Sequence, residues 1–145
     1  MEIRIIEHGS PEYAEMVELR NEVLRKPLLL HYTEEYLENE KDTTLIACFK
    51  KERLVGCCLL RVISEEVIQL QQMAVATGLQ GKGIGKKLIE FAEETAINRG
   101  FYKLFMHARK SAVGFYKKLG YEVLGDEFEE VTIPHFMMRK DFHHS

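Results

Sequence analysis

The sequence predicts one mixed α/β domain, in which a mostly antiparallel, twisted sheet is flanked by helices. With 145 residues, of which 46% are hydrophobic and 30% charged, the chain can build one core and has an ordinary globular composition. The segment 43–76 alternates in the strand period and contains only short turns, which are typical of antiparallel neighbours. The second half alternates strands with helices. No repeat or linker marks a boundary, so residues 1–145 are expected to form a single domain.

The first half begins with an alternating strand over 2–7 and a helix that has clear start and stop signals. Ser10 supplies a helix cap and Pro11 suits the first helical position. Pro27 is expected to stop the helix near Arg25, because the residue before a proline avoids helical angles. Thr33 caps a second, shorter helix. An antiparallel meander then follows, with strands at 44–49, 54–63 and 67–76.

The second half begins with an amphipathic helix over 84–99, whose end is marked by Gly100. The sequence then predicts a strand over 101–108, a helix over 111–119, a strand over 121–124 and a last strand over 132–141. The last strand carries Pro134 near its start and is expected to pair antiparallel with the strand that begins at Tyr121. One helical crossover joins parallel neighbours, so the sheet is mixed.

Charge and cysteine content argue against several classes of partner. A net charge of −3 and a pI near 6.1 disfavour general nucleic-acid binding, which needs a basic face. No apolar run reaches membrane-spanning length and the first residues lack a signal-peptide pattern, so we expect no membrane association and a cytoplasmic protein.

Cys48, Cys57 and Cys58 are expected to be buried free thiols, and no ligand spacing indicates a metal. His143 and His144 resemble a frayed terminus. Homodimer formation is left open.

The segment 73–89 combines a buried strand, a glycine-rich turn and the start of the helix. Lysines crowd that helix start, where the helix dipole disfavours positive charge, at Lys82, Lys86 and Lys87. A bound polyanion would reverse this cost. Glycines let phosphate oxygens approach the backbone, and here they stand at Gly81, Gly83 and Gly85. Neither the Walker loop nor the dinucleotide fingerprint fits this spacing. The turn therefore predicts an anion cradle of another type.

The turn reads Gln80-Gly81-Lys82-Gly83-Ile84-Gly85 and follows Met73-Ala74-Val75. This pattern closely resembles the acetyl-CoA pyrophosphate loop of the GNAT acetyltransferase superfamily. A second stretch, from Ala112 to Tyr121, matches the family pattern Ala-x-x-Phe-Tyr-x-x-x-Gly-Phe/Tyr. The resemblance covers about 43–141 and implies a sheet that is splayed between the strands at 67–76 and 101–108. Arg109 is a departure, since many family members carry asparagine there.

The resemblance implies an N-acetyltransferase that uses acetyl-CoA as co-substrate and no metal. The acetyl group would pass to a primary amine of a small molecule or peptide by direct attack in a ternary complex. Tyr116 is expected to return a proton to the leaving thiolate. Cofactor binding is implied for the strand residues Met73, Ala74 and Val75 and for the loop residues Gln80, Gly81, Lys82, Gly83, Ile84, Gly85 and Lys86.

The general base is not marked by a carboxylate on the central strand. Family members often place a glutamate there, but the matching stretch reads Gln69-Leu70-Gln71-Gln72, and glutamine does not accept a proton at neutral pH. The candidate named here is His135; a water held by the amides is an alternative, as are Glu129, Glu34 and His107. The missing carboxylate also motivates another function, a non-catalytic acyl-CoA-binding regulator. A nucleotide hydrolase is a third hypothesis.

The acceptor pocket is expected to form from two less diagnostic segments, 19–36 and the loop 125–134. The loop is acidic, and its carboxylates would suit a cationic amine; they are Glu127, Glu129 and Glu130. A solvated acidic loop with no role in binding explains the same residues equally well.

Overall fold

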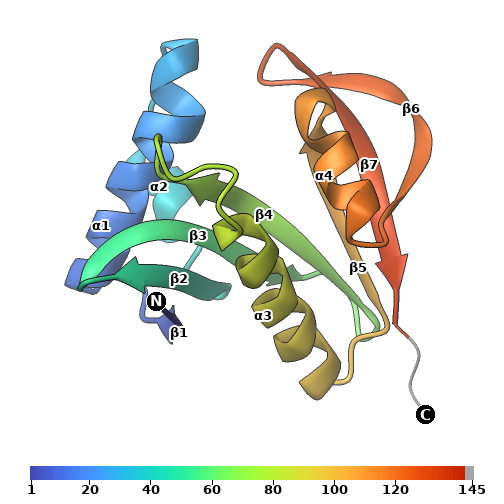
Figure 1. Ribbon diagram of the computed structural model, residues 1–145, viewed down its shortest axis with the longest axis horizontal. Helices are drawn as coiled ribbons and strands as arrows, with labels where there is room; N and C mark the ends of the chain where they lie inside the picture. Colours follow the sequence, from blue (N-terminus) through green and yellow to red (C-terminus); the bar gives the residue numbers. More distant parts are fainter. Residues whose placement is uncertain (143–145) are drawn as a thin grey trace.

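The computed structural model describes residues 1–142, and within them seven strands form one mixed sheet (Figure 1). The order across the sheet is β1-β2-β3-β4-β5-β7-β6, and every neighbouring pair is antiparallel except β4 with β5. The strands are β1 (Glu2–Ile6), β2 (Thr44–Lys50), β3 (Arg53–Val62), β4 (Val67–Val75), β5 (Lys103–Arg109), β6 (Glu122–Glu130) and β7 (Ile133–Asp141). The predicted mixed, mostly antiparallel sheet is confirmed. His143 and His144 lie outside the described residues.

Helices cover both faces of the sheet. One face packs against α1 (Pro11–Arg20), and the other packs against α3 (Ile84–Asn98) and α4 (Val113–Lys118). Ser10 caps α1 as predicted, because its hydroxyl accepts the Tyr13 N–H at 3.1 Å. The short α2 (Glu34–Glu38) begins at its predicted cap, Thr33. No helix within residues 1–142 is long and apolar enough to cross a membrane.

The first helix ends earlier than the sequence predicts. Regular α-helix stops at Arg20, and the chain continues as a π-helical turn, η1 (Asn21–Arg25), and a 3₁₀ turn, η2 (Lys26–Leu28). The expected stop near Arg25 coincides with the end of η1, but residues 21–25 are not the regular α-helix that was expected. Proline has no N–H to donate and its ring crowds the preceding carbonyl groups, so the hydrogen-bond pattern changes before the proline is reached. Pro27 itself lies inside the tighter turn.

The central strands are buried on both faces, which places a separate core on each side of the sheet. Along β2, Leu45 and Ala47 pack with α1, whereas Ile46 and Cys48 pack with α3. This alternation follows from the two-residue period of a strand. The three cysteines are buried free thiols, as predicted.

β4 and β5 pair only where they begin, over Val67–Gln69 and Lys103–Phe105. Further along β4, the pairing with β3 shifts register and Gln72 adopts a positive φ of 55°, so the strand carries a bulge. In Figure 1 the two strands meet at the lower right and separate towards the top. The predicted splay between these strands is confirmed, and it opens the sheet at its centre.

The acidic segment after Tyr121 is not the predicted loop. β6 continues to Glu130 after a bulge between Leu124 and Phe128, and a two-residue turn at Val131 and Thr132 joins it to β7. Pairing resumes after the bulge because Phe128 opposes His135 across the two strands. β7 pairs with β6 as predicted and also with β5, so it lies between them.

Candidate functional site

A cavity of about 950 Å³ lies where β4 and β5 diverge. It is lined by ten of the twelve residues that the sequence singles out as catalytic or cofactor-binding, namely Met73, Ala74, Val75, Gln80, Gly81, Gly83, Gly85, Lys86, Tyr116 and His135. Lys82 is exposed and is not part of the lining, and the Ile84 side chain is 4% exposed and belongs to the core. Ile84 can still offer its backbone N–H at the start of α3.

The glycine turn places the free end of a long helix at this cavity. Gly83 is the cap residue of α3, with a φ of 87° and no side-chain hydrogen bond to the helix. The first N–H groups of a helix have no partner within the helix, and they favour an anion. An added Cβ at Gly81 or Gly83 would meet no heavy atom within 4 Å, so the space over the turn is open. A diphosphate fits such a cradle, with Lys86 beside it.

The turn is fastened to the end of β4 by the side chain of Gln80. Its Nε2 donates to the Val75 carbonyl oxygen at 3.2 Å. Through this contact, Gln80 links the end of β4 to the turn that begins α3. Two parts of the predicted cofactor site are thereby held in a fixed relation.

Tyr116 lies on α4 and is 5% exposed at the cavity wall. Its ring contacts Phe115 and Tyr121 edge-on, with centroids 5.0 and 5.9 Å away. The hydroxyl makes no hydrogen bond within residues 1–142. Burial, and to a lesser extent the Cys58 thiol, raises the pKa of Tyr116, so the hydroxyl keeps its proton throughout the neutral range.

His135 belongs to a cluster with His107 and Glu130 that lines the same cavity. The Nδ1 of His135 lies 2.8 Å from the Ile133 carbonyl oxygen, which can only accept, so Nδ1 carries the proton. In the neutral ring, Nε2 is then free to accept a proton, and it lies 3.6 Å from a Glu130 oxygen. The other Glu130 oxygen lies 3.0 Å from Nδ1 of His107. A proton arriving at His135 would therefore meet a carboxylate that stabilises the imidazolium.

The glutamines of β4 hold the strand and its neighbours in place. Gln72, at the bulge, accepts from the Tyr32 hydroxyl at 2.6 Å and donates to the Tyr36 hydroxyl at 2.8 Å. Gln71 donates to Gln69 at 2.9 Å. The segment before α2 is thus tied to the bulged part of β4, and β4 contributes amide groups and no carboxylate to the cavity lining.

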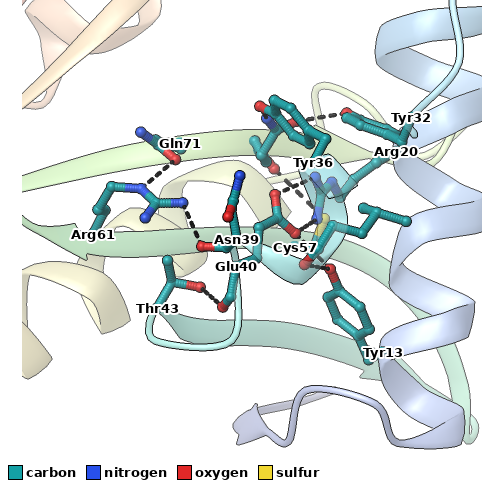
Figure 2. A network of polar contacts seen from close by, with 12 residues as sticks. Tyr13, Arg20, Tyr32, Tyr36, Asn39, Glu40, Thr43, Cys57, Arg61 and Gln71 are labelled. Atoms are coloured by element: carbon teal, nitrogen blue, oxygen red, sulfur yellow. Dashed lines mark hydrogen bonds and ion pairs between the residues drawn. The ribbon is translucent and has the colours of Figure 1, made fainter. Parts of the chain in front are cut away.

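A buried ion pair joins α1 to the segment that follows α2 (Figure 2). Arg20 donates two hydrogen bonds to Glu40, at 2.8 and 2.7 Å, and both side chains are almost fully buried. Tyr13 donates to the same carboxylate at 2.7 Å. The Arg20 guanidinium also lies over the ring of Tyr32, 4.6 Å from its centroid. This network supports the wall from which Tyr32 reaches Gln72.

Several alternative base candidates do not reach the cavity. Glu34 and Glu129 are absent from its lining, whereas His107 is part of it. Of the acidic residues expected in the acceptor pocket, Glu130 alone lines the cavity within the described residues, and Glu127 pairs with Lys110 at 3.0 Å on the surface. The strand conformation of 125–130 explains this, because alternate side chains point to opposite faces.

Sequence reasoning missed two arginines that line the cavity, Arg25 and Arg109. Arg25 falls in the segment that was expected near the acceptor, but nothing marked it out from the other charges there. Arg109 was visible as a departure from the family pattern, which was the one available signal.

The family described as acetyltransferase (GNAT) domain matches residues 12–142. Among sequence relatives in Bacillus subtilis (strain 168), the uncharacterized N-acetyltransferase YjcF is 29% identical over 138 residues, covering 94% of this chain and 98% of that protein. The uncharacterized protein YyaT is 29% identical over 96 residues, and the match covers 66% of this chain and 64% of YyaT. This chain thus spans just under two thirds of YyaT.

Solved structures of similar fold agree with these matches. A putative N-acetyltransferase from Lactobacillus plantarum has a TM-score of 0.83 at 23% identity, covering 97% of this chain and 99% of that one. An aminoglycoside 6'-N-acetyltransferase complexed with coenzyme A has a TM-score of 0.81 at 16% identity, covering 97% of each chain. At these identities the likeness concerns the fold.

Proposed function

Because the chain belongs to the GNAT acetyltransferase family, we propose that it transfers an acetyl group from acetyl-CoA to a primary amine of a small molecule or peptide. The amine attacks directly, within a complex that holds both substrates. The buried thiols Cys57 and Cys58 take no part, since neither lines the cavity. Bound coenzyme A in a structural neighbour supports the choice of co-substrate.

The observation that carries the proposal is the convergence of three elements on one cavity. Gly83 starts α3, Tyr116 lies on α4 and His135 lies on β7, and all three line the space between β4 and β5. An anion cradle, a proton donor and a proton acceptor are the groups that acetyl transfer from a thioester to an amine needs.

Each residue has a separate task in the proposed step. The α3 start and its glycines hold the diphosphate, and the unpaired edge of β4 near Met73 offers backbone N–H groups to the carbonyl oxygen. The amine nitrogen forms a bond to the carbonyl carbon while the bond from that carbon to sulfur breaks. His135 accepts the proton that the amine loses, and Tyr116 gives its proton to the departing sulfur.

A second candidate function is a non-catalytic acyl-CoA-binding regulator. It is favoured by the amide side chains that occupy β4 where family members often have a glutamate. The His135 and Glu130 cluster offers a base from other strands, which makes the enzyme the better-supported choice. Turnover that depends on an amine acceptor would exclude the pure regulator.

The direct test of the proposal is isothermal titration of the protein with acetyl-CoA, ATP and NAD, followed by thiol-release assays on an amine panel. We expect acetyl-CoA to bind most tightly and at least one amine to release coenzyme A. Tighter binding of ATP or NAD would overturn the proposed co-substrate, and measurable nucleotide turnover would revive the nucleotide hydrolase.

A further inference from the structure

Two guanidinium groups lie near each other at the cavity wall. Arg109, at the end of β5, donates from its Nη2 to the Leu24 carbonyl oxygen at 3.1 Å. Leu24 directly precedes Arg25, and both arginines line the cavity. Arg25 in turn lies over the ring of Tyr32, 4.6 Å from its centroid. β5 and η1 thus bring two positive charges to one place.

Neither of these arginines meets a carboxylate within residues 1–142. The buried Arg20 pairs with Glu40, and the more exposed Arg4 and Arg139 also have acidic partners. Arg25 and Arg109, both half-buried, form no ion pair in the described part of the chain. Burial lowers the pKa of Arg109, an effect that Tyr32 opposes and the charge of Arg25 reinforces. Such a pair is stabilised when an anion arrives.

The position of the two arginines relative to His135 limits how far the anionic group of a bound acceptor can lie from its amine. Arg109 directly opposes His135 in the pairing of β5 with β7, so the two side chains project from the same face as near neighbours. When the amine of a bound molecule reaches His135, a group that is a few bonds away from that amine can therefore lie beside Arg109. The planar fork of a guanidinium matches a carboxylate.

We propose that the acceptor carries a carboxylate close to its amine, as an amino acid does, and that Arg25 and Arg109 bind that carboxylate. The inference rests on the proposed acetyl transfer and names the substrate class for the same site. It replaces the expectation of a purely cationic amine, which the acidic segment 125–134 had suggested. Glu130 is the one carboxylate among the described lining residues, and it is engaged by His107 and His135.

The test compares amino acids with their own α-carboxamides as acceptors at saturating acetyl-CoA, using thiol release as readout. The two members of each pair differ in the carboxylate and share the side chain. We expect the preferred amino acid to exceed its amide in kcat/KM by about tenfold or more, since charge-assisted hydrogen bonds are lost with the amide. Equal or better use of the amides would overturn the inference and leave the acetyltransferase proposal standing.

Variants that remove a positive charge then test which residues cause the preference for a carboxylate. Arg25→Gln and Arg109→Gln should each raise KM for the amino acid about tenfold and leave acetyl-CoA affinity unchanged. The KM of Arg25→Lys should lie between those of the wild type and Arg25→Gln, because lysine keeps the positive charge but lacks the planar guanidinium fork. Arg53→Gln is the matched control, since Arg53 is exposed and lies outside this cavity. Should Arg109→Gln unfold through loss of its bond to Leu24, Arg25→Gln decides, because the Arg25 side chain makes no hydrogen bond within residues 1–142.

A binding measurement covers the case in which no amine is acetylated. That result would count against the catalytic proposal. The inference is then judged by thermal stabilisation of the coenzyme A-loaded protein by N-acetyl amino acids and by their amides. Stabilisation by the acids that Arg25→Gln abolishes supports a carboxylate site, and equal effects of acids and amides overturn it.

Discussion

At the scale of single residues, Tyr116 is the proposed proton donor, and its hydroxyl makes no hydrogen bond within residues 1–142. Tyr116→Phe keeps the ring contacts with Phe115 and Tyr121 and removes no hydrogen bond of the described chain. We expect kcat to fall roughly a hundred- to ten-thousand-fold, the usual range for general acid catalysis. Acetyl-CoA affinity and Tm should stay near those of the wild type, as measured by titration and thermal unfolding.

Turnover of the phenylalanine variant within a few-fold of the wild type would mean that Tyr116 is a core residue. The thiolate would then leave unassisted or take a proton from water. A large drop in Tm would instead show that the hydroxyl has a packing role.

His135 is the second residue whose chemistry can be separated from its structure. His135→Gln removes the nitrogen that accepts the proton, so kcat should fall by about a hundredfold or more, with acetyl-CoA affinity unchanged. His31→Gln serves as control, because His31 is exposed and outside the cavity lining. Steady-state kinetics at fixed pH give the comparison. A kcat near that of the wild type would reassign the base to water or to His107.

At the scale of elements, the start of α3 and its glycine turn are proposed to bind the diphosphate of acetyl-CoA together. Gly83→Val should weaken acetyl-CoA binding at least tenfold, because the added side chain occupies the open space over the turn and favours a negative φ. Lys86→Ala should weaken it less, since a single exposed charge contributes less than the backbone cradle. Titration calorimetry measures both.

Backbone strain needs its own control in this experiment. Gly9 has a similar φ of 79° with the same open surroundings and lies far from the cavity lining. Gly9→Val should therefore cost stability and leave acetyl-CoA affinity intact. If Gly83→Val folds and binds acetyl-CoA normally, the pyrophosphate assignment is wrong.

The buried ion pair between Arg20 and Glu40 joins α1 to the segment between α2 and β2. The contact between these elements therefore depends on the charge of Glu40. Glu40→Gln leaves Arg20 buried without its counter-charge, so we expect a loss of about 3–5 kcal/mol in the free energy of unfolding. Urea denaturation measures this. Glu38→Gln, which alters an exposed pair with Lys41, should change stability little. Equal stability of the two variants would mean that water reaches Arg20.

At the scale of the whole molecule, the buried acids with raised pKa values make stability fall at alkaline pH. Burial raises the pKa of Cys57 to about 12 and raises that of Cys58 as well. In the unfolded chain these thiols lose their protons near pH 8.5. Above that pH the unfolded state binds fewer protons than the native state, so stability declines as pH rises.

We therefore expect Tm to decrease steadily between about pH 8.5 and 10, with a shallower decrease in a Cys57→Ala/Cys58→Ala variant. Scanning calorimetry across that range measures both slopes. Identical slopes in the two proteins would show that the thiols ionise equally in both states.

The mixed sheet, its antiparallel meander, the flanking helices and the glycine turn follow largely from local sequence patterns, whereas the position of β7 between β5 and β6 does not. Ser10 and Thr33 start their helices, short turns force antiparallel neighbours, and glycine at position 83 opens the start of α3. Each of these signals acts within a few residues of the chain. For the same reason sequence reasoning misjudged 21–25 and 125–130, where a proline alters the turn before it and a bulge lets a strand continue.

By itself the sequence indicated the family and singled out the glycine turn before α3 and Tyr116 as candidate site residues. The tertiary structure alone decided which groups surround His135, because Arg109, His135 and Glu130 meet through the register of β5 with β7 and of β7 with β6. Register between strands depends on non-local pairing and on the bulge that displaces it, and neither is written in the spacing of any one segment. Arg25 joins them because η1 brings the neighbouring Leu24 into contact with Arg109, which no helical periodicity would indicate.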